Sequence, residues 1–138
     1  MKILFVCKSN FGRSQIAEAL FNDKSKKHIA KSAGTEDGRV IGHKLIDFPE
    51  HANLFLCMDE NGLDIRNKYS KLLTEDMINN ADRVYVMAEK ETWPAFLKES
   101  KKVIFWKVDD MCGESLERFR YTREKVKKLV DDLILEIE

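Results

Sequence analysis

The chain has 138 residues, of which 43% are hydrophobic and 35% charged, which is the size and balance of one ordinary domain. Its 24 basic residues equal its 24 acidic residues, so no overall field draws the protein to nucleic acid or to an anionic membrane. The apolar run at the start is too short for a signal peptide, and no stretch approaches the roughly 20 apolar residues of a membrane span. We therefore expect one cytoplasmic domain, residues 1–138, with no nucleic-acid or membrane partner.

Cysteine and histidine spacing predicts neither a disulfide framework nor a metal site. The chain contains three residues of each type: Cys7, Cys57 and Cys112, and His28, His43 and His51. The cysteines lack the C-x-x-C spacing, and the histidines lack the spacing of metal ligands. We expect reduced thiols, no metal, no cofactor, and histidines that are surface or core residues.

Strand and helix patterns alternate from the beginning of the chain. Residues 2–6 form a continuous apolar run, which is typical of a strand buried on both faces of a parallel sheet. The stretch 14–21 places its apolar residues on one helical face. A second strand is expected at 28–33, where it ends in the turn at Gly34.

The alternation continues to the end of the chain. The pattern predicts, in order, a helix over 49–60, a strand over 83–87, a helix over 89–100, a strand over 103–108 and a long closing helix from Ser115. Pro49 and Pro94 are compatible with the two shorter helices because proline is tolerated in a first turn. Such alternation predicts an α/β fold with a four-stranded parallel sheet, helices on both faces, and a ligand crevice at the carboxyl ends of the strands.

The segment after the first strand has the composition of a phosphate-binding loop. It is a C-x5-R motif that leads directly into a helix, with the sequence Cys7-Lys8-Ser9-Asn10-Phe11-Gly12-Arg13-Ser14. Backbone N–H groups of such a loop, with the positive end of the helix dipole, converge on the oxygens of a phosphoryl group. Gly12, and to a lesser degree Asn10, can adopt the positive φ angles that a tight loop requires. We expect residues 8–14 to bind the phosphate.

Three side chains of this loop carry the expected chemistry, the cleavage of a phosphate ester through a thiol. Arg13 can bind two phosphoryl oxygens at once and follow the charge as it spreads in the transition state. Cys7 lies among dipoles that favour the thiolate, so we expect it to be a nucleophile at neutral pH. A hydrogen bond from Ser14 would stabilise that thiolate further.

A second C-x5-R sequence shows how little the spacing alone means. The segment from Cys112 to Arg118 contains two glutamates and follows a loop instead of a strand. Fixed negative charge would repel a bound anion, so we reject this copy as a phosphate site. An inert core thiol remains the alternative for Cys7, and it is the role we expect for Cys57 on its apolar helix face.

A thiolate that displaces an alkoxide or phenolate also needs a general acid near the leaving oxygen. Asp109 and Asp110 follow the fourth expected strand, at the same edge of the sheet as Cys7, so one of them can reach the crevice. The alternative is that both are solvated, or that one caps the closing helix.

These motifs together resemble the low-molecular-weight protein tyrosine phosphatases and the related thioredoxin-coupled arsenate reductases, over nearly the whole chain. The matching segments are the loop Cys7 to Ser14, the sequence Ser32-Ala33-Gly34-Thr35 and the turn Glu60-Asn61-Gly62-Leu63-Asp64-Ile65. The resemblance implies that Ser32 supports the phosphate loop through Asn10. It also implies that Asp110 is the acid and that Lys8 contacts the substrate.

The chain departs from the family pattern at two places. Gly12 stands where many members carry a second cysteine, so Cys7 cannot form a disulfide within the loop. Met111 replaces the proline after the acid, which removes the stiffening that proline imposes on Asp110.

Three functions remain open at this point. The first is a phosphomonoester hydrolase that acts through a phosphocysteine on phosphotyrosine in proteins, or on a small aryl phosphate, and also binds inorganic phosphate and similar oxyanions. The second is an arsenate reductase, which needs further cysteines, and residues 80–100 contain none. The third is a phosphate-binding or phosphocysteine-carrier domain, against which Arg13 speaks because a transition-state clamp favours turnover.

Overall fold

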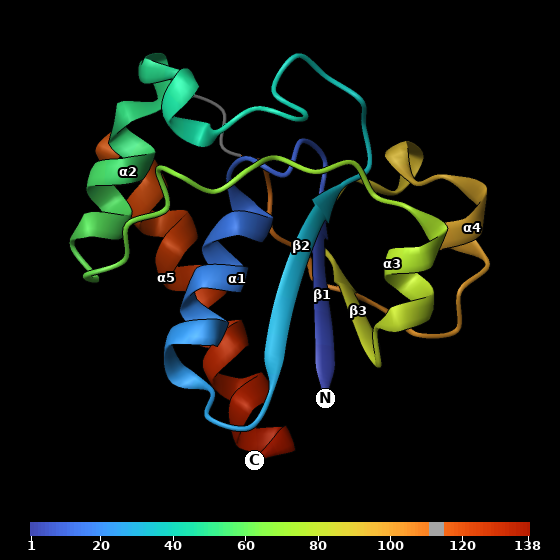
Figure 1. Cartoon of the computed structure of the whole chain (residues 1–138). Coiled ribbons are helices and arrows are strands. Elements are labelled where there is room, and N and C mark those ends of the chain that lie inside the picture. The colour runs from blue at the N-terminus through green and yellow to red at the C-terminus, as the bar shows by residue number, and fades with distance from the viewer. Residues whose placement is uncertain (111–114) are drawn as a thin grey trace.

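The fold is a parallel sheet covered by helices on both faces, seen here in a computed structural model that describes residues 1–110 and 115–138 (Figure 1). Its strands are β1 (Lys2–Cys7), β2 (Ile29–Gly34), β3 (Arg83–Val86) and β4 (Val103–Phe105). They form one four-stranded sheet in the order β2-β1-β3-β4, and every pairing is parallel. The predicted α/β fold class is confirmed.

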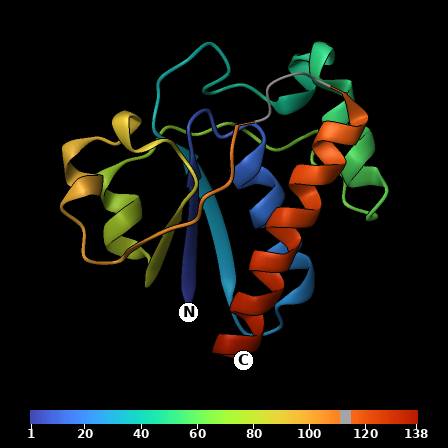
Figure 2. The same ribbon diagram turned by 180° about the vertical axis from the view of Figure 1, so that it is seen from behind.

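Two helical layers enclose the sheet. On one face lie α1 (Arg13–Lys24), α2 (Ala52–Asp59) and α5 (Leu116–Ile137), and the view from behind shows α5 running beside α1 (Figure 2). On the other face lie α3 (Glu75–Asn80) and α4 (Ala95–Lys98). Each layer has its own hydrophobic core, as expected for a sheet buried on both sides.

Strand β1 lies in the middle of the sheet and contributes to both cores. Ile3 and Phe5 pack with the α1 and α5 layer, whereas Leu4 and Val6 pack with the α3 and α4 layer. This alternation follows from the two-residue period of a strand. It directs Cys7, the last residue of β1, toward the α1 layer at the carboxyl edge of the sheet, which is the upper edge in Figure 1.

The single helix predicted over 89–100 is wrong. The structure has a 3-10 turn η3 (Lys90–Thr92), then extended backbone at Trp93 and Pro94, and then α4. A proline disfavours the α conformation of the residue before it, and Trp93 accordingly has a ψ of 128°.

The stretch predicted as one helix over 49–60 contains a 3-10 turn followed by an α-helix. The 3-10 turns η1 (Leu45–Asp47) and η2 (Pro49–His51) precede α2, and Pro49 does occupy a first-turn position. Helix α3 was not predicted. Its N-cap is Thr74, whose side chain accepts a hydrogen bond from the Met77 N–H.

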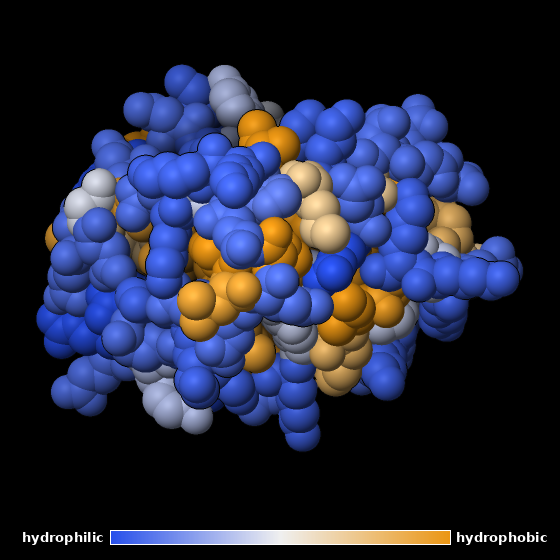
Figure 3. All heavy atoms as spheres, turned by 90° about the horizontal axis from the view of Figure 1, so that it is seen from below, coloured by the Kyte–Doolittle hydropathy of each residue, from blue (hydrophilic) through white to orange (hydrophobic). Residues whose placement is uncertain are grey.

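Hydrophobic side chains gather in patches separated by hydrophilic ones on the face seen from below in Figure 3. Within residues 1–110 and 115–138, the structure contains no helix both long and apolar enough to cross a membrane. Cys112 and Met111, on which two of the sequence arguments rest, lie outside the described residues.

Candidate active site

A small pocket of about 120 Å³ opens at the carboxyl edge of the sheet, beside the end of β1. Three elements far apart in the sequence meet there: the loop after β1, the segment before α2, and the segment that leads from β4 into α5. The residues that line the pocket are Cys7, Ser9, Phe11, Gly12, Arg13, Val40, His51, Asp110 and Phe119. The pocket therefore brings together the predicted nucleophile, clamp and acid.

The Cys7 thiol lies in a chain of short polar contacts. Its Sγ is 3.0 Å from the hydroxyl oxygen of Ser14, the second residue of α1. That oxygen in turn accepts a hydrogen bond of 2.7 Å from the amide nitrogen Nδ2 of Asn10. Because the hydroxyl oxygen is already an acceptor, its proton is available to Cys7 Sγ. The geometry fits the predicted stabilisation of a thiolate by Ser14.

The backbone of the loop is turned so that its N–H groups are available to an anion. The carbonyl oxygens of Cys7 and Lys8 accept hydrogen bonds of 2.9 Å each from the N–H groups of Thr35 and Glu36, just after β2. A trans peptide directs its N–H opposite to its carbonyl. The N–H groups of Lys8 and Ser9 therefore point away from β2, as a phosphate cradle requires.

Asn10 supplies the left-handed turn of this loop. Its φ is +54°, and it is fully buried. The carbonyl oxygen of Asn10 accepts a hydrogen bond from the Ser70 hydroxyl at 2.9 Å, and its Oδ1 accepts one from the Lys71 N–H at 2.8 Å. The expectation that Gly12 takes the positive φ is wrong, because Gly12 caps α1 with a φ of −103°.

The Arg13 side chain is only 2% exposed, and its guanidinium is held by two backbone carbonyl groups and by a carboxylate. Its Nη1 donates to the carbonyl oxygens of Met87 at 2.6 Å and Val108 at 2.9 Å. The Glu89 carboxylate accepts from Nη1 at 3.0 Å and from Nη2 at 3.2 Å. Burial opposes the charge of Arg13, but the hydrogen bond to Glu89 and the attraction of Cys7, Asp110 and Glu89 outweigh it, so the guanidinium pKa is raised.

The two candidate acids face different pockets. Asp110 lines the pocket that contains Cys7, and its Oδ1 lies 3.8 Å from Arg13 Nη2. Asp109 lines a neighbouring pocket with Glu89 and Lys107. Adjacent residues of an extended segment point in opposite directions, so this separation is expected. It favours Asp110 over Asp109 as the acid.

Two residues expected to act at the site lie differently from the prediction. Lys8 does not line the pocket, and its Nζ lies 3.8 Å from the Glu36 carboxylate. Ser32 donates a hydrogen bond to the Glu18 carboxylate at 3.2 Å and not to Asn10. Asn10 is held by Ser70 and Lys71, and by Ser14 and Gln15 of α1, so the loop is supported from different segments than predicted.

The sequence reasoning missed four further residues at this site, among them Phe119 of α5, which lines the pocket. Glu89 follows the end of β3 at the same edge as Cys7, and that position could have suggested it. Val40 and His51 carry no such signal, because their place in the pocket depends on the irregular segment before α2. Among the described residues, no group of three or more histidine, cysteine or acidic side chains is placed to hold a metal ion.

A thiol and an arginine in one loop, at the carboxyl edge of a parallel sheet, define a cysteine-based enzyme that handles phosphate-like oxyanions. The family comparison gives the particular class. Residues 2–138 match the model of the low molecular weight phosphotyrosine protein phosphatases, and the chain belongs to that family.

Arsenate reductases and a protein tyrosine phosphatase are both similar to the chain over nearly its whole length. A glutaredoxin arsenate reductase of Synechocystis sp. is 32% identical, and the match covers 99% of this chain and 98% of that protein. The structure of a low molecular weight protein tyrosine phosphatase from T. tengcongensis is 29% identical, with a TM-score of 0.81 and 99% of both chains covered. An arsenate reductase solved in a phosphate binding state is 30% identical, with a TM-score of 0.75 and coverage of 99% and 98%.

Proposed function

We propose that the protein is a phosphomonoester hydrolase that acts on aryl phosphates, with phosphotyrosine as the model substrate. The observation that carries the proposal is the composition of the pocket. Cys7, Arg13 and Asp110 line it together, and Phe11, Val40 and Phe119 supply apolar wall. An aromatic leaving group fits such a wall, and a poorly activated phenolate needs the proton that Asp110 can give.

The reaction has two steps. In the first, the Cys7 thiolate attacks phosphorus, the S–P bond forms as the P–O bond to the leaving group breaks, and the leaving oxygen takes the proton of Asp110. In the second, water attacks the phosphocysteine and gives a proton to the Asp110 carboxylate, and the S–P bond breaks to release inorganic phosphate and the thiolate. Arg13 and the loop N–H groups stabilise the phosphoryl oxygens in both steps.

Hydrolysis of phosphotyrosine and phenyl phosphate by the wild type and by Cys7→Ser tests this proposal. We expect turnover in the wild type, none in the variant, and phosphate binding in both, since the loop N–H groups and Arg13 remain. Substantial activity of Cys7→Ser would remove Cys7 from the mechanism. Stoichiometric phosphorylation of Cys7 without turnover would instead indicate a carrier domain.

Arsenate reduction is the second candidate, and the 32% identity to the Synechocystis enzyme favours it. A reductase needs a second thiol to resolve the adduct of Cys7 with arsenate. Within residues 1–110 and 115–138 the pocket contains no thiol besides Cys7, and Cys57 is fully buried on α2. Burial raises the pKa of Cys57, which further disfavours it as a resolving thiolate. Arsenate-dependent oxidation of NADPH, with the glutaredoxin or the thioredoxin system as reductant, measures this activity directly.

A further inference from the structure

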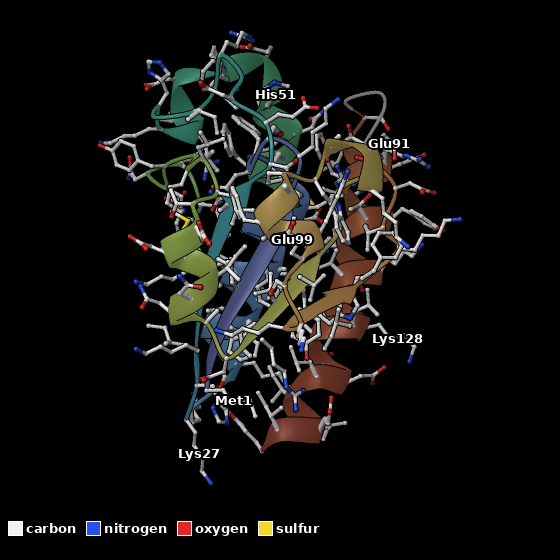
Figure 4. The ribbon with its side chains drawn as sticks, turned by 90° about the vertical axis from the view of Figure 1, so that its right-hand side faces the viewer. Met1, Lys27, His51, Glu91, Glu99 and Lys128 are labelled. Carbon is white, nitrogen blue, oxygen red and sulfur yellow. The ribbon has the colours of Figure 1, made fainter. Side chains whose placement is uncertain are left out.

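One ionisable side chain of the pocket has no part in the reaction described above. His51 is the last residue of η2 and lines the pocket together with Cys7 and Asp110. Figure 4 shows it at the same end of the molecule as Glu91, beyond the carboxyl ends of the strands. The sequence around His51 gave no reason to expect this side chain next to the phosphate loop.

Contacts between rings fix the position of His51. The centre of its imidazole lies 4.7 Å from that of the Phe11 ring, and Phe11 packs edge-to-face on Phe48 at 5.7 Å. Phe11 belongs to the phosphate loop itself. The imidazole is therefore held against the loop that binds the phosphoryl group, on the wall that also contains Val40.

The surroundings assign His51 to the leaving group and not to the phosphate. The phosphoryl oxygens have donors in the loop N–H groups and in Arg13, whereas His51 lies on a separate segment among the apolar residues of the wall. A group attached to the phosphate has to extend from the loop along a wall of the pocket, and His51 lies on one of these walls. His51 is thus placed to contact what distinguishes one phosphoester from another.

A protonated histidine is a cation, so it can attract a negatively charged group of a substrate. The charged groups that face it are Glu50 next in the chain and, across the pocket, Asp110, Arg13 and Cys7. Arg39 of the same segment is paired with Glu50 and lies over the Phe48 ring. His51 itself lines the pocket, so it can offer a positive charge to the leaving group.

We propose that His51 is a specificity-determining residue that favours aryl phosphates with a carboxylate on or beside the ring, such as phosphotyrosine next to an acidic residue. The inference rests on the proposed hydrolase function. The protonated imidazole attracts a carboxylate of the leaving group and has no such attraction for an uncharged group at the same place. The phosphoryl group itself is bound the same way for both leaving groups.

A pair of substrates that differ only in charge tests the inference. 4-Carboxyphenyl phosphate and 4-carbamoylphenyl phosphate have nearly the same shape, and the carboxylate of the first is ionised at about pH 6. At this pH we expect the ratio of their kcat/KM values to be about 3- to 5-fold higher in the wild type than in His51→Phe, as for a partly exposed ion pair. His51→Phe keeps a ring on Phe11.

His43→Phe is the matched control. His43 contacts the Phe48 ring, which packs on Phe11, at 6.1 Å between ring centres, but does not line the pocket. It should behave as the wild type. The same ratio in His51→Phe and wild type would overturn the inference alone. That outcome includes an equal loss of activity on both substrates, which would place His51 on the phosphoryl group. If the wild type hydrolyses neither substrate, the proposed function fails and the inference fails with it.

Discussion

The phosphate loop and the segment that carries Asp110 form two walls of the same pocket but are built differently. In the loop, Asn10, Arg13 and Ser14 are almost fully buried and hydrogen-bonded to one another or to segments distant in sequence. The Asp110 side chain is 55% exposed, and its carboxylate lies 3.8 Å from Arg13. The parts that bind the phosphoryl group are therefore preorganised by buried contacts, whereas the acid is positioned from the surface.

Arg13→Lys is expected to cause the largest loss of activity on every substrate. An ammonium keeps the charge but cannot bond Met87, Val108 and Glu89 and still present two donors to a phosphoryl group. We expect kcat/KM to fall by roughly 10³–10⁵-fold, the range for an arginine that stabilises a phosphoryl transition state. Steady-state kinetics with phenyl phosphate measures it, and a loss of less than 10-fold would contradict the clamp assignment.

Asp110→Asn is expected to affect poor leaving groups selectively. Hydrolysis of phenyl phosphate should slow by ~10²–10⁴-fold, the usual contribution of a positioned general acid. 4-Nitrophenyl phosphate should be affected much less, because its leaving group departs as a stable anion. Comparison of kcat for the two substrates measures the effect.

Asp109→Asn is the internal control for the acid, since Asp109 lines the neighbouring pocket. It should leave the difference between the two substrates unchanged. If Asp109→Asn is the damaging substitution, the acid lies one residue earlier than proposed. If neither variant separates good from poor leaving groups, this segment supplies no acid.

Gly34→Ala tests how tightly the loop is supported from β2. A Cβ atom at Gly34 would lie 2.8 Å from the Lys8 carbonyl oxygen and 2.9 Å from the Asn10 nitrogen, so the loop backbone must move. We expect a loss of about 1–3 kcal/mol in the free energy of unfolding, the usual cost of overpacking, and weaker phosphate binding. Urea denaturation and calorimetric titration with phosphate measure the two effects.

Gly38→Ala is the matched control, because a Cβ there meets no atom within 4 Å. Both measurements should stay close to wild type. A Gly34→Ala variant of unchanged stability and phosphate affinity would show that the loop yields easily, and the contrast between the two walls would then disappear.

The sequence predicts the regular parts of the fold well because apolar periodicity determines them. The apolar run of β1 and the stripe on α5 are long enough to be read without ambiguity. Helix α3 has six residues and no such stripe, so only its cap at Thr74 and the acidic residues of its first turn could have indicated it. The helix predicted over 89–100 failed because Pro94 acts on Trp93 before it.

At the site, the sequence predicts the residues that act but not those that hold them. Cys7 and Arg13 follow from a motif next to a strand end. The support of Asn10 by Ser70 and Lys71 comes from an irregular segment about 60 residues further along the chain, which no local pattern places. For the same reason the prediction that Ser32 supports Asn10 fails, because in the structure Ser70 makes that contact.

Glu89→Gln tests how much the carboxylate of Glu89 contributes to holding Arg13 in the phosphate loop. It should have the smallest effect. Glutamine can still accept a hydrogen bond from Arg13 but carries no charge, so we expect kcat to fall by roughly 3- to 10-fold, the difference between a charge-assisted and a neutral hydrogen bond. Glu91→Gln is the control, because Glu91 lies on the same segment and is exposed at the surface (Figure 4). It should match the wild type in kcat.

The pH dependence of stability separates this role of Glu89 from a purely steric one. Burial would raise the pKa of Glu89, but the hydrogen bonds and charge of Arg13 outweigh it, so the pKa lies below the ordinary value of 4.5. A lowered pKa in the folded state contributes stability above pH 4.5 that is lost as the pH falls through the folded value. The wild type should therefore exceed Glu89→Gln in free energy of unfolding by a constant amount near neutral pH and by less as the pH falls below 4.5. A difference that does not change with pH would mean that the ion pair adds nothing, and that Arg13 is held by the carbonyl groups of Met87 and Val108 alone.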